Sequence, residues 1–244
     1  MASKKALIFY GGWDGHEPAL VANRFRKILE ARDFDVEMTD TLEPLADANK
    51  LNSLNLLVPC WTGHTGGIPR EASSAISEAV GAGVGVAGCH GGMCDTFRSD
   101  TQWQFITGGQ WVSHPGGDGI EYTVNVRRGT SPLVDGIEDF QVTSEHYYLH
   151  IDPSVEVLAT TRFPQVTYYH NANKPVDMPV VWTKYWGLGR VFYCSLGHHD
   201  DVFDTAPQAQ TLMERGLLWA AGGKEYAKAN GLTVDRYLNT AKMY

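Results

Sequence analysis

Three apolar runs in the first half of the chain each end in a glycine-rich loop. They cover Ala6–Tyr10, Leu54–Cys60 and Gly85–Cys89, and a fourth strand-like segment, Asp35–Thr39, lies between the first two. Continuous apolar runs of this length are typical of strands that are buried on both faces of a parallel sheet. This feature constrains the fold most strongly, because such a sheet needs a layer of helices on each side.

Two amphipathic segments between these strands supply the expected helices. His16–Glu30 carries one apolar stripe. A second helix begins at Pro69, in the first turn, where proline is favoured, with Ala72, Ile76 and Val80 on one face. Alternating strand, glycine loop and helix predicts βαβ units, and right-handed crossovers place helices on both faces of the sheet. The expected fold is therefore a flavodoxin-like three-layer α/β sandwich with a mostly parallel central sheet.

The second half of the chain predicts strands of a different kind. Tyr122–Val126 and Val155–Thr160 alternate apolar and polar residues, as half-exposed strands do. Val180–Leu196 predicts an added β-hairpin with a glycine turn, and Gln208–Ala221 predicts a helix that ends at a pair of glycines. No linker rich in proline, serine or charge separates the halves, so residues 1–244 are expected to form a single domain.

Charge and composition exclude several classes of partner. The chain of 244 residues has a formal net charge of −8, which disfavours nucleic acid and anionic membranes because both require a basic surface. Its apolar runs are shorter than the roughly 18 residues that span a bilayer, and the N-terminal run is interpreted as a strand rather than a signal peptide. Four widely spread cysteines suit reduced thiols, so a cytoplasmic location is expected.

Glycine-rich loops can also bind phosphate, but the motifs that do so are missing. The sequence contains neither G-x-x-x-x-G-K-[ST] nor G-x-G-x-x-G after the first strand. Few lysines or arginines lie in these loops, and Arg70 is the nearest. No nucleotide cofactor is therefore expected.

Histidines follow four of the predicted buried strands. The loops after these strands each combine glycine with at least one histidine, namely His16, His64, His90 and the pair His198 and His199. Ligands of open α/β sheets bind outside the carboxyl ends of the strands. A single histidine is usually structural, but the repeated pairing of glycine and histidine at strand ends predicts that at least three of them share one site.

The element Gly88-x-His90-x-Gly92 resembles a nucleophile elbow in its spacing. Flanking glycines allow a sharp turn from strand to helix that presents the middle side chain. Here that side chain is an imidazole, which is a good acid, base or metal ligand but a poor stable nucleophile. Cys89 precedes it and is expected to point into the core.

Two later segments carry further candidate groups. His114 lies near the end of a glycine-rich loop, and Glu145 is followed by His146 and Tyr147. If this second segment is extended, Glu145 and His146 face opposite sides and only one enters a given pocket. Aromatic residues in the same loops suit the apolar face of a sugar ring, although tryptophan is also a frequent core residue; they are Trp13, Trp61, Trp111 and Tyr147.

Together these residues resemble the ThuA-like (trehalose utilisation) family over nearly the whole chain. The resemblance rests on G-G-x-x-x-H-E after the first strand, the G-x-H-G-G elbow, the G-G-x-W-x-x-H-P loop and S-E-H-Y-Y. Its most specific part runs from Pro179–Thr183 through Gly187–Arg190 to Val191–His198, and the helix segment Arg215–Ala220 also matches.

The resemblance implies a class I glutamine amidotransferase-like variant of the flavodoxin-like fold. It places His90 where amidotransferases carry their cysteine nucleophile and His198 near their catalytic histidine, so glutamine hydrolysis by a thiol is not expected. The family is associated with catabolism of trehalose and related disaccharides, through 3-keto derivatives. This chain departs from the family in having Ser144-Glu145 instead of an acidic pair, and in having His199.

The leading hypothesis is a sugar-catabolic enzyme that uses histidine and glutamate acid–base chemistry, assisted by a divalent metal, for isomerisation, epimerisation, elimination or hydrolysis. The expected catalytic residues are His90, His198 and Glu145. The expected substrate-binding residues are Trp13, Asp14, His16, Trp61, His64, Trp111, His114 and Tyr147. Zinc or manganese is expected at His90, His146 and His198. The expected partner is a small-molecule carbohydrate, and a homo-oligomer is compatible with the composition.

Two alternatives stay open at the level of sequence. One is a non-catalytic sugar-binding or regulatory protein that keeps an amidotransferase-like pocket. The other is a thiol hydrolase that uses Cys89 or Cys94, which requires an exposed thiol of low pKa.

Overall fold

One nine-stranded sheet runs through both halves of the chain in this computed structural model, which describes residues 3–63, 67–164 and 174–237. The strand order is β2-β1-β3-β4-β11-β10-β9-β6-β7. The first five strands are mutually parallel; they are β2 (Phe34–Thr39), β1 (Lys4–Gly12), β3 (Leu56–Thr62), β4 (Gly85–Cys89) and β11 (Gly189–Cys194). The remaining four pair antiparallel; they are β10 (Val176–Trp186), β9 (Glu156–Phe163), β6 (Ile120–Val126) and β7 (Phe140–Ser144).

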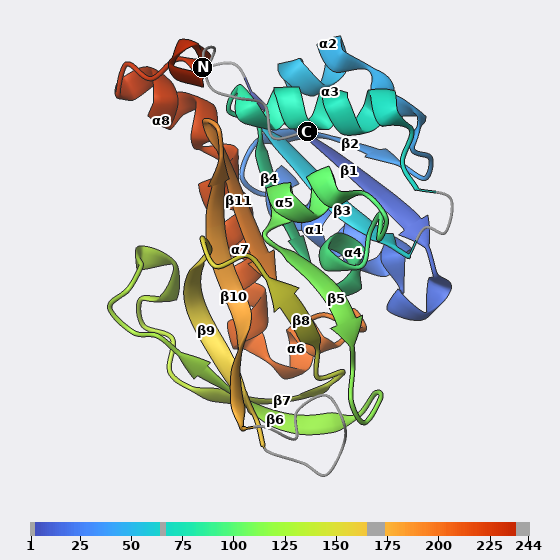
Figure 1. The fold of residues 1–244 in the computed structure, drawn as a ribbon, viewed down its shortest axis with the longest axis vertical. Coiled ribbons are helices and arrows are strands. Elements are labelled where there is room, and N and C mark those ends of the chain that lie inside the picture. Colours follow the sequence, from blue (N-terminus) through green and yellow to red (C-terminus); the bar gives the residue numbers. More distant parts are fainter. Residues whose placement is uncertain (1–2, 64–66, 165–173, 238–244) are drawn as a thin grey trace.

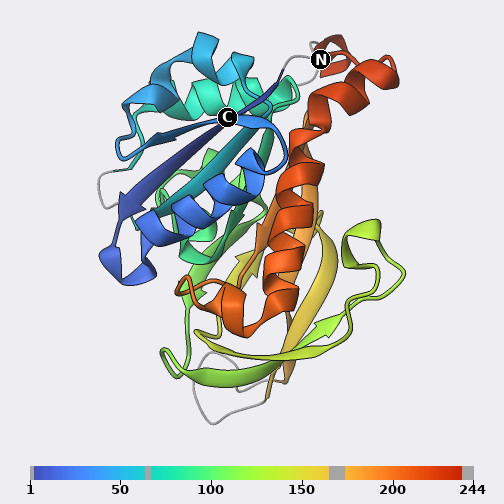
Figure 2. The ribbon, with the colours of Figure 1, turned by 180° about the vertical axis from the view of Figure 1, so that it is seen from behind.

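Helices cover both faces of the parallel half of the sheet. Figure 2 shows α1 (Pro18–Glu30) and α7 (Pro207–Ala221) side by side across one face. The opposite face, toward the viewer in Figure 1, carries four helices and a two-stranded sheet. These elements are α2 (Ala48–Ser53), α3 (Arg70–Gly81), α4 (His90–Cys94), α5 (Thr101–Thr107), β5 (Gly109–Ser113) and β8 (Tyr148–Ile151). The predicted three-layer α/β sandwich is confirmed.

The alternation of side chains along β1 divides the core in two. Ala6 and Ile8 belong to the core beneath α1 and α7, whereas Leu7 and Phe9 belong to the core beneath α3 and α5. Successive residues of a strand face opposite sides of a sheet. A run that is apolar at every position therefore needs a helix layer on both faces, which is the arrangement observed.

The predicted hairpin is present, but it is not an addition to the sheet. Its second strand, β11, pairs parallel with β4 and so completes the parallel half. Its first strand, β10, pairs antiparallel with β11 and β9 and begins the antiparallel half. The turn between them needs a left-handed residue, and Gly187 supplies it with φ of +57°.

The helix predicted from His16 begins two residues later. Glu17 has φ of +47° and interrupts the chain before Pro18, which starts α1. Asp14–His16 forms a separate 3-10 turn. Small elements complete the chain; they are Glu43–Ala46, Pro132–Val134, α6 (Val202–Thr205), α8 (Gly223–Ala229) and Val234–Tyr237. Within the described ranges, no helix has the length and apolar character that a bilayer crossing requires.

Candidate metal centre

Four loops bring one side chain each to a common point at the carboxyl ends of the strands. His16 lies in the turn after β1, His90 begins α4 directly after β4, and His198 follows β11. Glu145 comes from the antiparallel half, directly after β7. All four side chains are buried, with relative exposures between 1% and 6%. The sequence prediction that histidines after different strands converge is thus realised for these three.

The turn at His90 has the strand-to-helix geometry predicted for an elbow. His90 has φ of +45°, which a residue with a side chain rarely adopts. A Cβ at Gly88 would lie 2.9 Å from Pro59, and one at Gly92 would lie 3.0 Å from the Cα of Cys60. The two glycines therefore let α4 pack directly on β3, and this packing holds His90 in its strained conformation.

The imidazoles surround one oxygen of the carboxylate. Oε2 of Glu145 lies 3.1 Å from Nε2 of His90, 3.3 Å from Nδ1 of His198 and 3.9 Å from Nε2 of His16. Buried tyrosines hold the backbone around this point: the Tyr122 hydroxyl donates to the carbonyl of Glu145, and the Tyr193 hydroxyl donates to that of His90. We call the set His16, His90, Glu145 and His198 the buried cluster.

The outward-facing nitrogens of two of these histidines have partners of their own. Nδ1 of His90 lies 2.8 Å from the carbonyl oxygen of Ser195, and Nδ1 of His16 lies 2.7 Å from the hydroxyl of Thr62. Because a carbonyl only accepts, Nδ1 of a neutral His90 carries the proton, and Nε2 presents its lone pair to Glu145. Such outer hydrogen bonds are typical of histidines that bind metals.

The charges of these groups are compatible with a cation between them. Burial lowers the pKa of His90 to about 3, and burial also lowers the pKa of His16. For Glu145, burial alone would raise the pKa. The surrounding imidazoles of His16, His198 and His90 have the opposite and larger effect, so the pKa is lowered and the carboxyl stays ionised. In neutral His90 a lone pair faces a carboxylate oxygen at 3.1 Å, and either a proton or a metal ion between the two atoms removes the repulsion.

The residues present fit a divalent metal. Nδ1 of His198 is buried with no hydrogen-bond partner among the described residues, as an atom reserved for an ion would be. Three imidazole nitrogens and one carboxylate form a donor set that suits zinc or a similar borderline ion. Tetrahedral bonds of about 2.1 Å separate ligand atoms by about 3.4 Å, and the observed separations from the Glu145 oxygen, 3.1 to 3.9 Å, bracket this value.

His146 does not belong to this set, which corrects the expectation that it is a metal ligand. Its ring stacks between Tyr122 and Phe163, with centroid distances of 4.2 and 3.7 Å, and its Nε2 lies 3.0 Å from the hydroxyl of Thr161. Adjacent residues of an extended segment face opposite sides, so Glu145 points to the site and His146 to the core. His16, which was expected to bind substrate, takes its place.

Burial of His146 gives the metal-free protein a testable acid sensitivity. Burial lowers the pKa of His146 from 6.5 to about 4. As the pH falls between these values the unfolded chain binds a proton before the folded chain does, so the free energy of unfolding drops by up to about 1.4 kcal/mol per pH unit. We expect His146→Leu to make the loss of stability with falling pH shallower in this window.

Urea unfolding of the metal-free protein between about pH 7 and pH 4.5 measures this effect. His150→Leu, which removes an exposed histidine of β8, is the matched control. An unchanged pH dependence in His146→Leu would contradict the prediction.

Three of the predicted substrate-binding residues lie at the surface next to the buried cluster. The Trp13 side chain is 54% exposed, and its ring meets His16 edge-on at 4.7 Å. Nδ1 of His114, a half-exposed residue, lies 3.0 Å from the second oxygen of Glu145, and Trp111 lies beside its ring at 5.4 Å. Trp13, His114 and Trp111 thus form a rim on the cluster.

Other predicted residues do not line that rim. The Tyr147 ring stacks on His90 at 3.8 Å and is buried, so it supports the cluster from behind. Trp61 packs against the core beneath α3 and α5. Asp14 is exposed in the turn after β1, and His64 lies outside the described residues.

Sequence reasoning missed three contributors near the cluster. Thr62 and the carbonyl of Ser195 orient His16 and His90, and no local pattern distinguishes such partners. Asp118, in the glycine-rich segment after β5, approaches His198 from the solvent side. Its position between glycines predicts a turn and carries no signal for a ligand.

All four cysteines are free and buried, which argues against the thiol alternative. Burial raises the pKa of Cys60, Cys89 and Cys94, and it raises the pKa of Cys194 to about 12. A thiol of raised pKa carries almost no thiolate at neutral pH and is a poor nucleophile.

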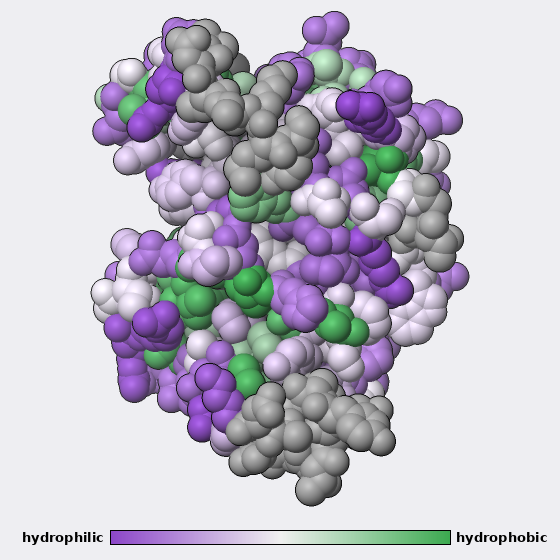
Figure 3. Space-filling view, viewed as in Figure 1, coloured by the Kyte–Doolittle hydropathy of each residue, from purple (hydrophilic) through white to green (hydrophobic). Residues whose placement is uncertain are grey.

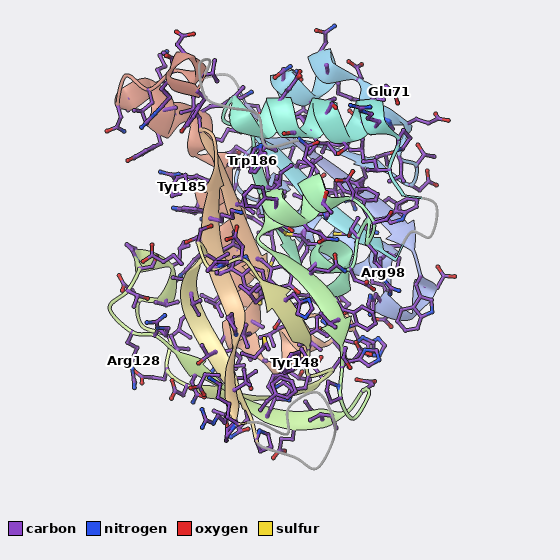
Figure 4. The ribbon with its side chains drawn as sticks, in the orientation of Figure 1. Glu71, Arg98, Arg128, Tyr148, Tyr185 and Trp186 are labelled. Carbon is purple, nitrogen blue, oxygen red and sulfur yellow. The ribbon has the colours of Figure 1, made fainter. Side chains whose placement is uncertain are left out.

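An open groove of about 540 Å³ lies elsewhere, between β5, β8 and β10. Figure 3 shows apolar residues gathered on this face, over the part of the molecule where β8, β9 and β10 lie in Figure 1. Figure 4 marks Tyr148 of β8, which lines the groove, and Arg98, which lies apart from it near the ends of β1 and β3. None of the four cluster residues lines this groove, so the buried cluster and the groove are separate features of the molecule.

Comparison with known proteins identifies relatives of the whole fold. Residues 5–220 match the model of the ThuA family, described as trehalose utilisation. A protein described as ThuA-like from Parabacteroides merdae ATCC 43184 superposes with a TM-score of 0.70 and 21% identity, covering 91% of each chain. A similar protein from Bacteroides uniformis ATCC 8492 gives 0.70 and 20%, covering 89% of this chain and 91% of that one. A cytoplasmic protein from Salmonella typhimurium LT2 gives 0.61 and 11%, covering 91% and 98%. No curated protein matches the chain.

Proposed function

The chain belongs to the ThuA (trehalose utilisation) family, and from this premise we propose that it is a sugar-catabolic enzyme with a divalent metal in its buried cluster. The observation that carries the proposal is the arrangement of His90. Its Nδ1 is committed to the carbonyl of Ser195, so its Nε2 faces the Glu145 carboxylate at 3.1 Å with a lone pair. A bound cation would remove the repulsion between the His90 lone pair and the Glu145 carboxylate. A cation beside a bound sugar can also polarise an oxygen atom of that sugar.

Acid–base groups lie where they can act on such an oxygen. A divalent ion supplies Lewis acidity, which acidifies the C–H bond next to a carbonyl. His114 reaches from the surface to within 3.0 Å of Glu145, and its imidazole can accept or donate a proton on the substrate side of the cluster. This suits isomerisation, epimerisation or elimination of a keto-sugar. The cluster contains a single carboxylate, whereas direct glycoside hydrolysis requires two that face each other.

The charges around the site favour a neutral sugar. Arg98 is held by Asp95, and Arg24 is held by Asp200, so the cations near the cluster are already paired. A phosphate or carboxylate group would find no free cation among these, and the exposed Trp13 offers an apolar surface for a sugar ring. Trehalose-related disaccharides and their 3-keto derivatives have this neutral character.

A second candidate is a sugar-binding protein whose metal is structural. The exposures of 1% to 6% favour it, because a closed set of four ligands is typical of structural zinc sites. In that case His114 and Trp13 would bind a sugar without turning it over.

The free thiols bear on where the protein works. Four buried cysteines without a disulfide suit a reducing compartment, and we propose the cytoplasm.

Assays with trehalose and 3-ketotrehalose test the enzyme proposal. We expect His90→Ala and His198→Ala each to lower turnover by at least about 10²-fold, because each removes a ligand or base of the cluster. His150→Ala, at an exposed histidine, is the control and should retain activity. Equal turnover in wild type and both cluster variants would reject the assigned roles. Sugar binding without product after long incubation would support the binding protein instead.

A further inference from the structure

A second group of candidate ligands lies on the solvent side of His198. Oδ2 of Asp118 is 3.8 Å from Nε2 of His198 and 3.4 Å from Nε2 of His199. We propose that Asp118, His198 and His199 form a second, solvent-facing metal site, which shares the ring of His198 with the buried cluster. The sharing rests on the proposed buried metal centre, whereas the solvent-facing site itself does not.

The spacing of these ligand atoms matches a metal site. Tetrahedral bonds of about 2.1 Å place neighbouring ligand atoms about 3.4 Å apart, close to both distances from Asp118. Direct hydrogen bonds from imidazole to carboxylate are shorter, about 2.7 to 2.9 Å. The carboxylate therefore stands at the distance of a fellow ligand of one ion rather than of a hydrogen-bond acceptor.

Each of the two rings has a carboxylate oxygen within 4 Å of both of its nitrogens. His198 faces Glu145 through Nδ1 and Asp118 through Nε2. His199 faces Glu17 through Nδ1, at 3.8 Å, and Asp118 through Nε2. A neutral imidazole carries one N–H, so one nitrogen of each ring presents a lone pair to a carboxylate. A cation beside Asp118 would bind these lone pairs and offset the negative charge of that carboxylate.

A second carboxylate lies behind the ring of His199 and is itself held in place. Nδ1 of His199 points to Glu17, and the Glu17 carboxylate is itself fixed by the backbone N–H of Asp200 at 2.9 Å. Asp200 is held in turn by Arg24. A carboxylate behind a ligating histidine fixes its ring and its tautomer. Glu17 lies too far from His199 for a hydrogen bond, but a small shift would bring it into this role, and Nε2 of His199 already faces Asp118.

The second site differs from the buried cluster in being open. Asp118 and His199 have side-chain exposures of 51% and 37%, so water or a substrate oxygen can complete the coordination of an ion held by two imidazoles and one carboxylate. The exposed Trp13 lies beside His198, with ring centroids 6.3 Å apart. A sugar stacked on Trp13 would therefore lie next to His198, which belongs to both proposed sites.

If one ion binds to each nitrogen of His198, the ring must lose a proton, and the two ions can be detected as a coupled pair. The ring gives up its remaining N–H proton to solvent and becomes a bridging imidazolate. Two copper(II) ions bridged in this way couple their electron spins, so the paramagnetic signal is weakened relative to that of isolated ions. This signature does not depend on enzyme activity.

Metal titration of the full-length chain tests the proposal. Metal-free protein is titrated with zinc chloride and the bound ions are counted after gel filtration, and the same samples are loaded with copper(II) for EPR. We expect two ions per wild-type chain, and one in Asp118→Asn or His199→Gln, with affinity at the second site falling at least about tenfold. The controls Asp35→Asn and His150→Gln change exposed residues of β2 and β8 and should keep two.

His90→Gln separates this proposal from the buried centre, because it removes a ligand of the buried cluster alone. One ion in His90→Gln that is lost on adding His199→Gln supports the solvent-facing site, even if wild type also binds only one. One ion in wild type that is unaffected by Asp118→Asn and His199→Gln overturns it while the buried centre stands. Two ions with the full copper signal of isolated sites overturn the shared ring.

Discussion

Replacing Glu145 by glutamine is expected to lower turnover by at least about 10²-fold and to weaken zinc binding in the buried cluster at least about tenfold. Glutamine has nearly the same shape, but it removes the charge that faces His90 at 3.1 Å and His198 at 3.3 Å. Its NH₂ group would also compete with a cation for the lone pair of His90. The fold should persist, because the Tyr122 hydroxyl binds the backbone carbonyl of residue 145 and not its carboxylate.

The measurement is elemental analysis after dialysis against buffered zinc, followed by assays on 3-ketotrehalose. Glu121→Gln removes an exposed carboxylate from β6 and serves as the matched control, which should behave as wild type. Glu145→Gln protein with wild-type zinc content would show that the carboxylate is not a ligand. Loss of zinc with full turnover would show that the ion takes no part in the reaction.

Gly91→Ala is expected to displace His16 and to weaken metal binding in the cluster at least about tenfold, although it adds only a methyl group. A Cβ at Gly91 would lie 2.4 Å from Cε1 and 2.6 Å from Nδ1 of His16, and 2.9 Å from the Tyr147 hydroxyl. Contacts this short force a shift, and overpacking of this kind costs about 1–3 kcal/mol. The ring of His16 would lose its hydrogen bond to Thr62 and its direction toward Glu145.

Gly81→Ala is the control, because a Cβ on that residue of α3 meets no atom within 4 Å. It should change the free energy of unfolding by less than about 1 kcal/mol and leave zinc binding intact. If Gly91→Ala acts through His16, then combining it with His16→Gln should add little further loss of affinity. Additive losses would mean that Gly91 affects the site by another route.

The parallel half of the fold was predictable from local patterns. The run Ala6–Tyr10 lies within β1, and Gly85–Cys89 coincides with β4. An apolar run between two glycine loops has few alternatives in a chain of this length, since it must be covered on both faces. The position of the hairpin in the sheet could not be predicted from the sequence, because its local pattern is the same at the edge of a sheet and in its interior. Only the pairing of β11 with β4 distinguishes the two.

The residues of the candidate site also fall into those that the sequence could predict and those that it could not. Strand-end position placed His16, His90 and His198 together, because the carboxyl ends of parallel strands share one edge. Choosing between Glu145 and His146 required the direction of the chain after β7, and sequence alone indicated only that they diverge. Asp118 reaches the site from a loop whose sequence indicates a turn, so its contact with His198 follows from tertiary structure alone.

The sequence by itself therefore determined which segments form the layers and which strand ends carry imidazoles, since both depend on periodicity and on neighbours along the chain. The tertiary structure decided which nitrogen of each imidazole faces the carboxylate, which histidine turns into the core, and which distant carboxylates join the rings. Those properties depend on the hydrogen bond from His90 to Ser195 and on the stacking of His146 between Tyr122 and Phe163. Such contacts join residues far apart in the chain, so no local pattern encodes them.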